Sequence, residues 1–201
     1  VVIPQSFTVQ DAGRSDAGTW QTLPDGRWLW RLELRSPGAV SLELAFDRFF
    51  LPQGAELWFS SPDGSTVRGP WTDVDNPANG RFHTPLVWGD TALLELVVPA
   101  ALRAQVSLRN RAVGWAFRDV MRGTSPYQSK SGSCNVDTRC PEGDPHREQI
   151  ESVASYTFFD DAEPGTFTCT GQLLNNTAQD RRLLFSTANH CVSSATEDDS
   201  A

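Results

Sequence analysis

One histidine near the end of the chain lies where a catalytic imidazole could be held in place. His190 follows an apolar, strand-like run, Leu183–Phe185, from which small residues separate it, and Cys191 comes directly after it. A general base needs such a setting: a stiff strand for position, small neighbours for space and a covalent tie against movement. An ordinary surface or core histidine is the alternative for any isolated histidine, so the rest of the chain has to decide.

All four cysteines lie in the last third of the chain, at Cys134, Cys140, Cys169 and Cys191. An even number confined to one segment predicts disulfides and an oxidising compartment. A zinc site is the alternative, because Cys134, Cys140 and the nearby His146 could supply three ligands. The spacing of those two cysteines is unusual for zinc ligands, and the sequence contains no Cys-x-x-Cys pair. We therefore expect no metal and no cofactor.

Composition and charge limit the possible partners. The chain has 201 residues, 39% hydrophobic and 21% charged, a balance typical of a soluble globular protein with room for one large domain or one domain and part of another. The net charge is −8 and the basic residues are scattered, which argues against nucleic acid as a partner. No apolar run reaches the roughly 18 residues of a membrane span. The N-terminal residues lack a basic stretch followed by an apolar core, so we expect no signal peptide in this chain.

The first 120 residues are predicted to form an antiparallel β-sandwich. Turns rich in Pro and Gly recur at short intervals, and strand-like runs with two-residue alternation lie between them. In the run 27–35, Trp30, Leu32 and Leu34 are expected to point inward and the charged residues between them outward. Further strands are expected at 40–46, 55–60, 92–98 and 104–108. Short strands with frequent turns and almost no helical patterning indicate an all-β fold.

All seven tryptophans fall in this predicted sandwich. Packing between sheets explains such residues, because Trp buries a large area and favours strands. An aromatic platform that binds carbohydrate or a partner protein is the alternative. The region offers no nucleophile with a base, no metal cluster and no phosphate loop, so we expect it to be non-catalytic.

Residues 121–133 have the composition of a linker, without apolar periodicity and rich in Ser, Gly and basic residues. Lys130 within this segment is the only lysine of the chain, and Ser131 follows it. An exposed segment of this kind is accessible to proteases. The placement suggests a lysine-specific maturation cut between Lys130 and Ser131.

Two stretches of the last third resemble a known family. The run Cys169-Thr170-Gly171-Gln172-Leu173 and the later run Thr187-Ala188-Asn189-His190-Cys191 resemble the first barrel of chymotrypsin-fold serine proteases. The segment from Ser131 to Asp137, the Cys-Pro-Glu-Gly run at 140–143 and the Asn-Asn-Thr loop at 175–177 are similar to lysyl endopeptidase-like bacterial proteases. The resemblance covers 130–192 closely and the predicted sandwich loosely, where it suggests a pro-region.

The resemblance implies specific roles for several residues. His190 would be the general base that takes the serine proton, and Cys169 would be bonded to Cys191. Cys134 and Cys140 would pair with cysteines further along the family's chain, or with each other. Protein or peptide substrates and a secreted location are also implied. Residues 134–201 would then be the start of a trypsin-like protease domain, with the first strands of a chymotrypsin-like β-barrel.

The family's catalytic aspartate and its nucleophile segment lie downstream of the histidine, and this chain contains neither. Asp160 and Asp161 precede the strand to the histidine and are not expected to belong to the triad, and Ser186, Ser193 and Ser194 carry no nucleophile motif. The chain is therefore expected to be inactive alone. Three strands cannot close a barrel, so residues after about 145 are expected to pack on the missing remainder of the protease domain or to be poorly ordered.

Two functions follow from these observations. The first is the N-terminal part of a secreted serine endopeptidase precursor, cleaving after lysine or basic residues by Ser-His-Asp acyl transfer. The alternative is a Trp-rich carbohydrate- or protein-binding module fused to a degenerate protease segment.

Overall fold

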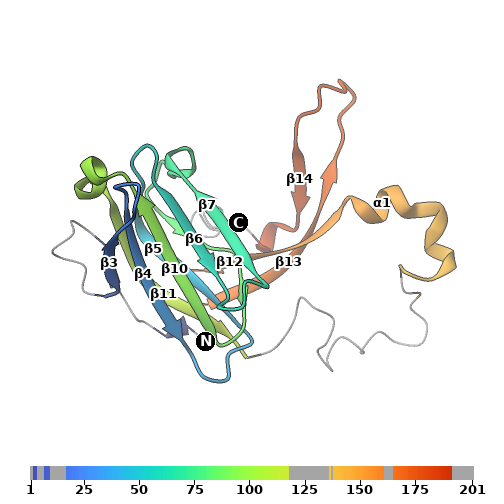
Figure 1. Ribbon diagram of the computed structural model, residues 1–201. Coiled ribbons are helices and arrows are strands. Elements are labelled where there is room, and N and C mark those ends of the chain that lie inside the picture. The colour runs from blue at the N-terminus through green and yellow to red at the C-terminus, as the bar shows by residue number, and fades with distance from the viewer. Residues whose placement is uncertain are drawn as a thin grey trace. The chain divides into compact units, whose positions relative to one another are not determined.

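The computed structural model describes residues 2–3, 7–9, 17–117, 136, 138–160 and 165–191. These residues form mostly antiparallel strands with a few short helices (Figure 1), so the all-β prediction is confirmed. The chain divides into two compact units, which consist mainly of residues 1–117 and residues 118–199. Each unit is described by itself.

A six-stranded antiparallel sheet forms one layer of the first unit. Its strand order is β1-β11-β5-β8, with β2 also paired to β11 and β9 also paired to β5. The long strands β5 and β11 form its centre, and β11 accommodates a register shift around Asn110. The strands are β1 (Val2–Ile3), β2 (Phe7–Val9), β5 (Ser41–Phe50), β8 (Phe82–His83), β9 (Val87–Trp88) and β11 (Ser107–Ala116).

A five-stranded antiparallel sheet forms the other layer, in the order β3-β4-β10-β6-β7. The two-residue period of strands places Trp30 and its partner Leu96 on the core face, while Arg31 and Glu95 form an ion pair on the opposite face. The predicted alternation of the run 27–35 is thus confirmed. The strands are β3 (Thr19–Thr22), β4 (Trp28–Arg35), β6 (Glu56–Ser60), β7 (Val67–Trp71) and β10 (Thr91–Val98).

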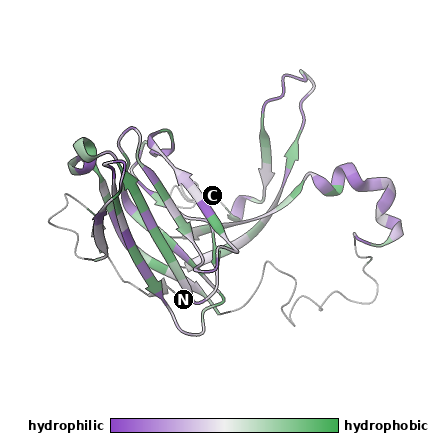
Figure 2. Cartoon of the chain, viewed as in Figure 1, coloured by the Kyte–Doolittle hydropathy of each residue, from purple (hydrophilic) through white to green (hydrophobic). Residues whose placement is uncertain are grey.

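The two sheets share one hydrophobic core, which makes the unit a β-sandwich. Leu44 and Phe46 of the six-stranded sheet belong to the same buried cluster as Trp30, Phe59 and Leu94 of the five-stranded sheet. Burial of each such side chain stabilises the fold by roughly 1.5–3 kcal/mol. Figure 2 shows hydrophobic and hydrophilic residues alternating along several of these strands, as a sheet with one buried face requires.

Five of the seven tryptophans lie in this core or pack against it. Trp30 is fully buried, and its indole nitrogen donates a hydrogen bond to the Ala17 carbonyl oxygen (3.0 Å). Four more pack against the core cluster: Trp20, Trp28, Trp71 and Trp115. Trp58 and Trp88 are outside this cluster, and their registers with Glu95 and Ser41 place them on the outer faces of the two sheets. The sequence-based alternative of an aromatic platform therefore rests on two side chains that lie on different sheets.

One predicted strand begins markedly later than the sequence suggested. Residues 104–105 belong to a 3₁₀ helix, Ala100–Gln105, and β11 starts only at Ser107. Pro99 before this helix cannot donate to a strand ladder, and the alanine-rich run after it has little strand preference. In the last third of the chain, good helix formers make helix α1 (Arg147–Glu151), and the strand that follows it begins at Val153. A further 3₁₀ turn spans Asp73–Asp75.

The second unit contains a three-stranded antiparallel sheet in the order β12-β13-β14. A 3₁₀ helix (Pro141–His146) and α1 precede β12 (Val153–Asp160), which is followed by β13 (Gly165–Leu174), β14 (Leu184–Thr187) and a 3₁₀ turn (Asn189–Cys191). The strand registers place Tyr156, Phe158, Phe167, Leu173 and Phe185 on one face. Phe167 and Phe185 remain more than 40% exposed on this aromatic face.

Candidate functional site

His190 lies in the tight turn that follows β14. The strand ends at Thr187, and the Cys191 amide closes the turn by donating a hydrogen bond to the Ala188 carbonyl oxygen (2.9 Å). The imidazole is exposed, and it has no hydrogen-bond partner among the residues that the structure describes. An exposed, unengaged imidazole can accept a proton from an incoming group, which is what a general base must do.

A disulfide ties this turn to the middle strand of the sheet. Cys191 is buried and is bonded to Cys169 of β13, with their Cα atoms 6.2 Å apart. The resemblance to chymotrypsin-fold proteases implied this same pairing. Closing a loop with a sequence separation of 22 residues stabilises the folded chain by about 3 kcal/mol. The bond therefore limits how far the residue next to it, His190, can move.

A chain of hydrogen bonds fixes the end of the strand that leads to the histidine. Thr187 donates from its hydroxyl to the Thr170 carbonyl oxygen on β13 (2.9 Å), so the hydroxyl of Tyr156 on β12 donates to Thr187 Oγ1 (2.9 Å). All three strands thus meet at Thr187. The sequence reasoning missed Tyr156, since no local pattern links residues that lie 31 positions apart.

Gly171 permits the close contact between β13 and β14 at the same place. A methyl group at this position would overlap the Phe185 ring and lie 2.7 Å from the Ser186 carbonyl oxygen. Phe185 in turn packs edge-on against Tyr156, with ring centres 5.6 Å apart. The glycine of the Cys-x-Gly-x-Leu run therefore has a packing reason: an aromatic side chain covers it.

The sulfur atoms beside the histidine are not suited to hold a metal. Potential ligand atoms of Cys169, His190 and Cys191 lie within 4.8 Å of one another. However, both sulfurs belong to the disulfide, and a metal needs thiolates. The zinc alternative proposed from sequence involved Cys134, Cys140 and His146, of which Cys134 lies outside the described residues. Among the described residues, neither Cys140 nor His146 joins a group of three metal-binding side chains.

Other predicted residues lie apart from His190 or outside the described part of the chain. Asp160 pairs with Gly165 at the far end of β12, four residues or about 13 Å beyond Tyr156. Ser186 is exposed and neighbours Thr187, so it points to the opposite face of the sheet. Cys140 has no disulfide partner among the residues that the structure describes. The remaining candidates lie outside the described residues: Lys130, Ser131, Cys134, Asp161, Ser193 and Ser194.

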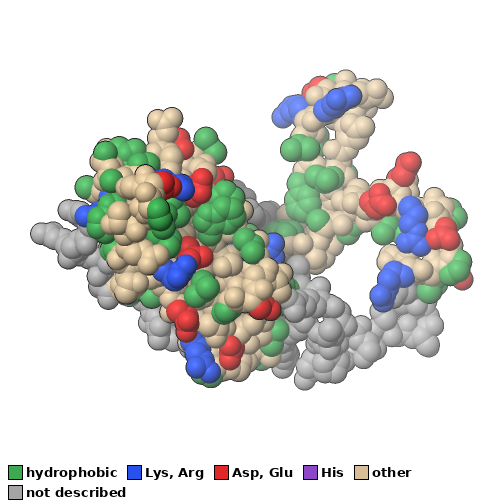
Figure 3. Space-filling model, viewed as in Figure 1, with side chains coloured by type: hydrophobic (Ala, Val, Ile, Leu, Met, Phe, Trp, Pro, Cys, Tyr) green, Lys and Arg blue, Asp and Glu red, His purple; other side chains and the backbone are tan. Residues whose placement is uncertain are grey.

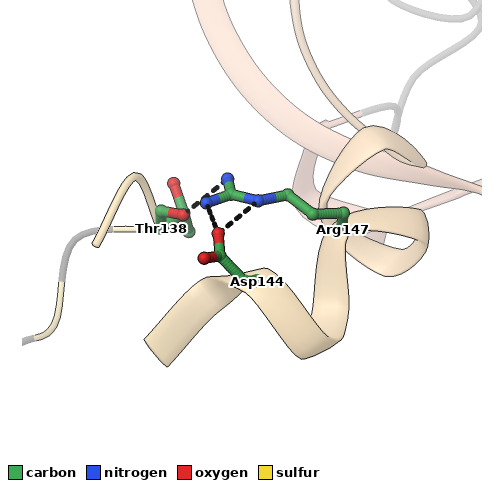
Figure 4. A network of polar contacts seen from close by, with 3 residues as sticks. All are labelled: Thr138, Asp144 and Arg147. Carbon is green, nitrogen blue, oxygen red and sulfur yellow. Dashed lines mark hydrogen bonds and ion pairs between the residues drawn. The ribbon is translucent and has the colours of Figure 1, made fainter. Parts of the chain in front are cut away.

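A second cluster of polar contacts, shown in Figure 4, holds together the segment that precedes the three-stranded sheet. The Arg147 guanidinium donates through Nη1 to the Thr138 carbonyl oxygen (2.9 Å), and through Nε and Nη2 to Asp144 Oδ1 (3.1 and 2.5 Å). The Gly143 amide donates to the Cys140 carbonyl oxygen (2.9 Å) in the same turn. The sequence reasoning did not identify this pair, although its Asp-x-x-Arg spacing is a signal for it, since residues three apart face each other on a helix.

Comparisons with known proteins match two separate ranges of the chain to two family models. A family model described as "Lysyl endopeptidase N-terminal domain" matches residues 5–113, and one described as "Lysyl endopeptidase, C-terminal domain" matches residues 128–201. A lysyl endopeptidase from Pseudomonas aeruginosa is 32% identical over 183 residues, which are 86% of this chain and 39% of that protein. No solved structure matches the chain.

Both family models and the curated relative carry the name of an endopeptidase. The chain belongs to the lysyl endopeptidase family. It spans 39% of the length of the Pseudomonas relative. Within the described residues, no helix is long and apolar enough to cross a membrane.

Proposed function

We propose that this chain is the N-terminal part of a secreted serine endopeptidase precursor that cleaves after lysine. One observation carries the proposal: His190 lies on a turn that a disulfide and a three-strand hydrogen-bond chain hold in place, in a chain of the lysyl endopeptidase family. The disulfide also supports a secreted location, since such bonds persist in oxidising compartments.

In this mechanism His190 takes the proton from the serine hydroxyl that attacks the substrate peptide bond, and then gives a proton to the leaving amine. The serine and the orienting aspartate come from the rest of the protease domain. Within the described residues, no serine or carboxylate is bonded to His190. The 201-residue chain alone is therefore proposed to be catalytically silent, and the missing remainder of the domain to be its partner.

The catalytic role of His190 is tested by His190→Ala in the complete precursor. We expect hydrolysis of a lysyl peptide substrate to fall by about 10⁴-fold or more, because the serine then lacks its base. His146→Ala is the matched control, since this histidine is also exposed and lies in the same unit. A His190 variant that keeps normal turnover while folding normally would remove the catalytic assignment.

We further propose that residues 1–120 form a pro-region, that 121–133 form a linker, and that maturation cuts between Lys130 and Ser131. The single lysine and the gap between the two family matches, at residues 114–127, support this division. Exposing the precursor to a lysine-specific protease should give a new chain that starts at Ser131. Lys130→Arg should block the cut, and a different new N-terminus would contradict the site.

A further inference from the structure

The basic residues of this chain are almost all arginine. Sixteen of its seventeen lysine and arginine residues are Arg, and the one lysine is Lys130 in the predicted linker. Both side chains carry a positive charge and serve solubility equally well, so charge alone does not explain this choice. Each arginine that the structure describes can be checked for a contact that a lysine would not make.

Several arginines do make such contacts. Arg147 uses three nitrogens to bind Thr138 and Asp144, and Arg31 binds Glu95 through both Nε and Nη2. The Arg103 guanidinium lies over the Trp28 ring, with its carbon 3.9 Å from the ring centre. A lysine ammonium does not reproduce these flat, multi-donor contacts, so the fold itself accounts for arginine at these positions.

Arg181 and Arg182 differ from these arginines in where they lie and in what their side chains contact. They lie in the loop 175–183 between β13 and β14, and both are exposed. Their side chains make no hydrogen bond or ion pair with any residue that the structure describes; only the Arg182 backbone amide donates, to Asp180 Oδ1 (3.1 Å). Figure 3 shows basic side chains on the surface at the free end of this hairpin. Local structure therefore gives no reason for arginine over lysine here.

The same loop has the properties of a protease-sensitive segment. Its backbone is irregular, with left-handed φ angles of 50° at Gln179 and 59° at Arg181, and Leu183 just after Arg182 is 90% exposed. Proteases hydrolyse exposed loops far faster than strands within a sheet, because the chain must leave its own hydrogen bonds to enter an active site. A lysine at position 182 would offer a lysine-specific protease an accessible bond. Hydrolysis there would cut the chain just before β14, the strand that leads to His190.

We propose that arginine at exposed loop positions protects this chain from the lysine-specific protease that the complete protein forms. The loop 175–183 resists cutting because it contains no lysine, and not because its fold keeps a protease out. The linker contains the only lysine of the chain, so it is the one segment of this chain that the protease can cut. This inference rests on the proposed lysine specificity. It adds that self-resistance is a selected property of the non-catalytic surface.

The test uses four versions of the 201-residue chain: the wild type, Arg182→Lys, Arg31→Lys and Arg182→Gln. Arg31 is the matched control, because its side chain is also exposed (51%) but it lies in the middle of a paired strand. Each chain is incubated with a purified reference protease of established lysine specificity, and the products are identified by mass spectrometry. Cutting in the linker shows in every sample that the protease is active.

We expect Arg182→Lys to be cut after residue 182 at least about tenfold faster than Arg31→Lys is cut after residue 31. The Arg182→Gln chain should remain uncut in this loop and keep wild-type hydrogen exchange in β13 and β14. Three outcomes would overturn the inference: no cut after residue 182, equal rates for the two lysine variants, or faster exchange in the glutamine variant. Faster exchange in the glutamine variant would mean that Arg182 has a structural role.

A second arm separates this inference from the proposed function. The mature enzyme, produced from the complete precursor, replaces the reference protease. If the reference protease cuts Arg182→Lys in the loop and the mature enzyme also does so, both ideas are supported. If only the reference protease cuts there, the loop is accessible but the proposed lysine specificity is wrong, and self-protection is overturned with it.

Discussion

Glu43 and His83 lie on the outer face of the six-stranded sheet, and burial shifts their pKa values in opposite directions. The register of β5 places Glu43 opposite Gly114 and His83 opposite Ala45, on the face away from the core. Burial raises the pKa of Glu43 from 4.5 to about 7. Burial, together with repulsion from Arg111 and Arg81, lowers the pKa of His83 from 6.5 to about 4. Both groups are therefore favoured in their neutral forms in the folded state.

The two shifts have opposite effects on stability, which gives a prediction at the scale of single residues. Between about pH 4.5 and 7 the folded state holds more protons on Glu43 than the unfolded state, so stability falls as pH rises. Between about pH 4 and 6.5 the unfolded state holds more protons on His83, so stability rises with pH. The contributions of Glu43 and His83 to the pH dependence of the free energy of unfolding therefore cancel between about pH 4.5 and 6.5.

Single substitutions should reveal each slope. Glu43→Gln should leave a free energy of unfolding that increases with pH between about 4 and 6.5, by up to about 1.4 kcal/mol per pH unit. His83→Gln should leave one that decreases between about 4.5 and 7. Urea unfolding measured at several pH values checks both. Glu33→Gln, which removes an exposed carboxyl group of the other sheet, is the control, and equal profiles for all variants would contradict the assignment.

At the scale of elements, the hairpin that carries the histidine turn depends on one glycine. Gly171→Ala should destabilise the three-stranded sheet by about 1–3 kcal/mol, because the added methyl group overlaps the Phe185 ring. Faster hydrogen exchange in β13 and β14 would measure the effect. Combining the change with Phe185→Leu should recover part of the loss, since the smaller side chain leaves room. No difference between single and double variants would show that the ring is not the cause.

The elements also show what sequence alone can establish. Alternation in β4 was readable because charged residues alternate with the apolar ones, and the Cys169 and His190 motifs were readable as local strings. The 3₁₀ helix Ala100–Gln105 was read in part as strand, since short apolar runs suit either structure. The bond from Tyr156 to Thr187 depends on the strand register, which no local pattern encodes.

At the scale of the whole molecule, the hydrophobic core belongs to one unit. Every residue of the core cluster lies between Phe7 and Val113. We therefore expect residues 1–117, expressed alone, to fold and to unfold in one cooperative transition. Tryptophan fluorescence would follow this transition, because all seven tryptophans lie in that segment. A fragment without a cooperative transition would show that its sandwich needs more of the chain.

The exposed aromatic face of the three-stranded sheet has a consequence for the colloidal behaviour of the chain. Among the described strands, β12 and β14 each lack a partner on one edge, and Phe167, Leu173 and Phe185 stay exposed beside them. Such an edge can add a strand from a neighbouring molecule. Net negative charge opposes this at neutral pH but vanishes near the isoelectric point of about 4.8. The purified chain should therefore scatter light most strongly near that pH, and a charged residue in place of Leu173 should raise its solubility limit.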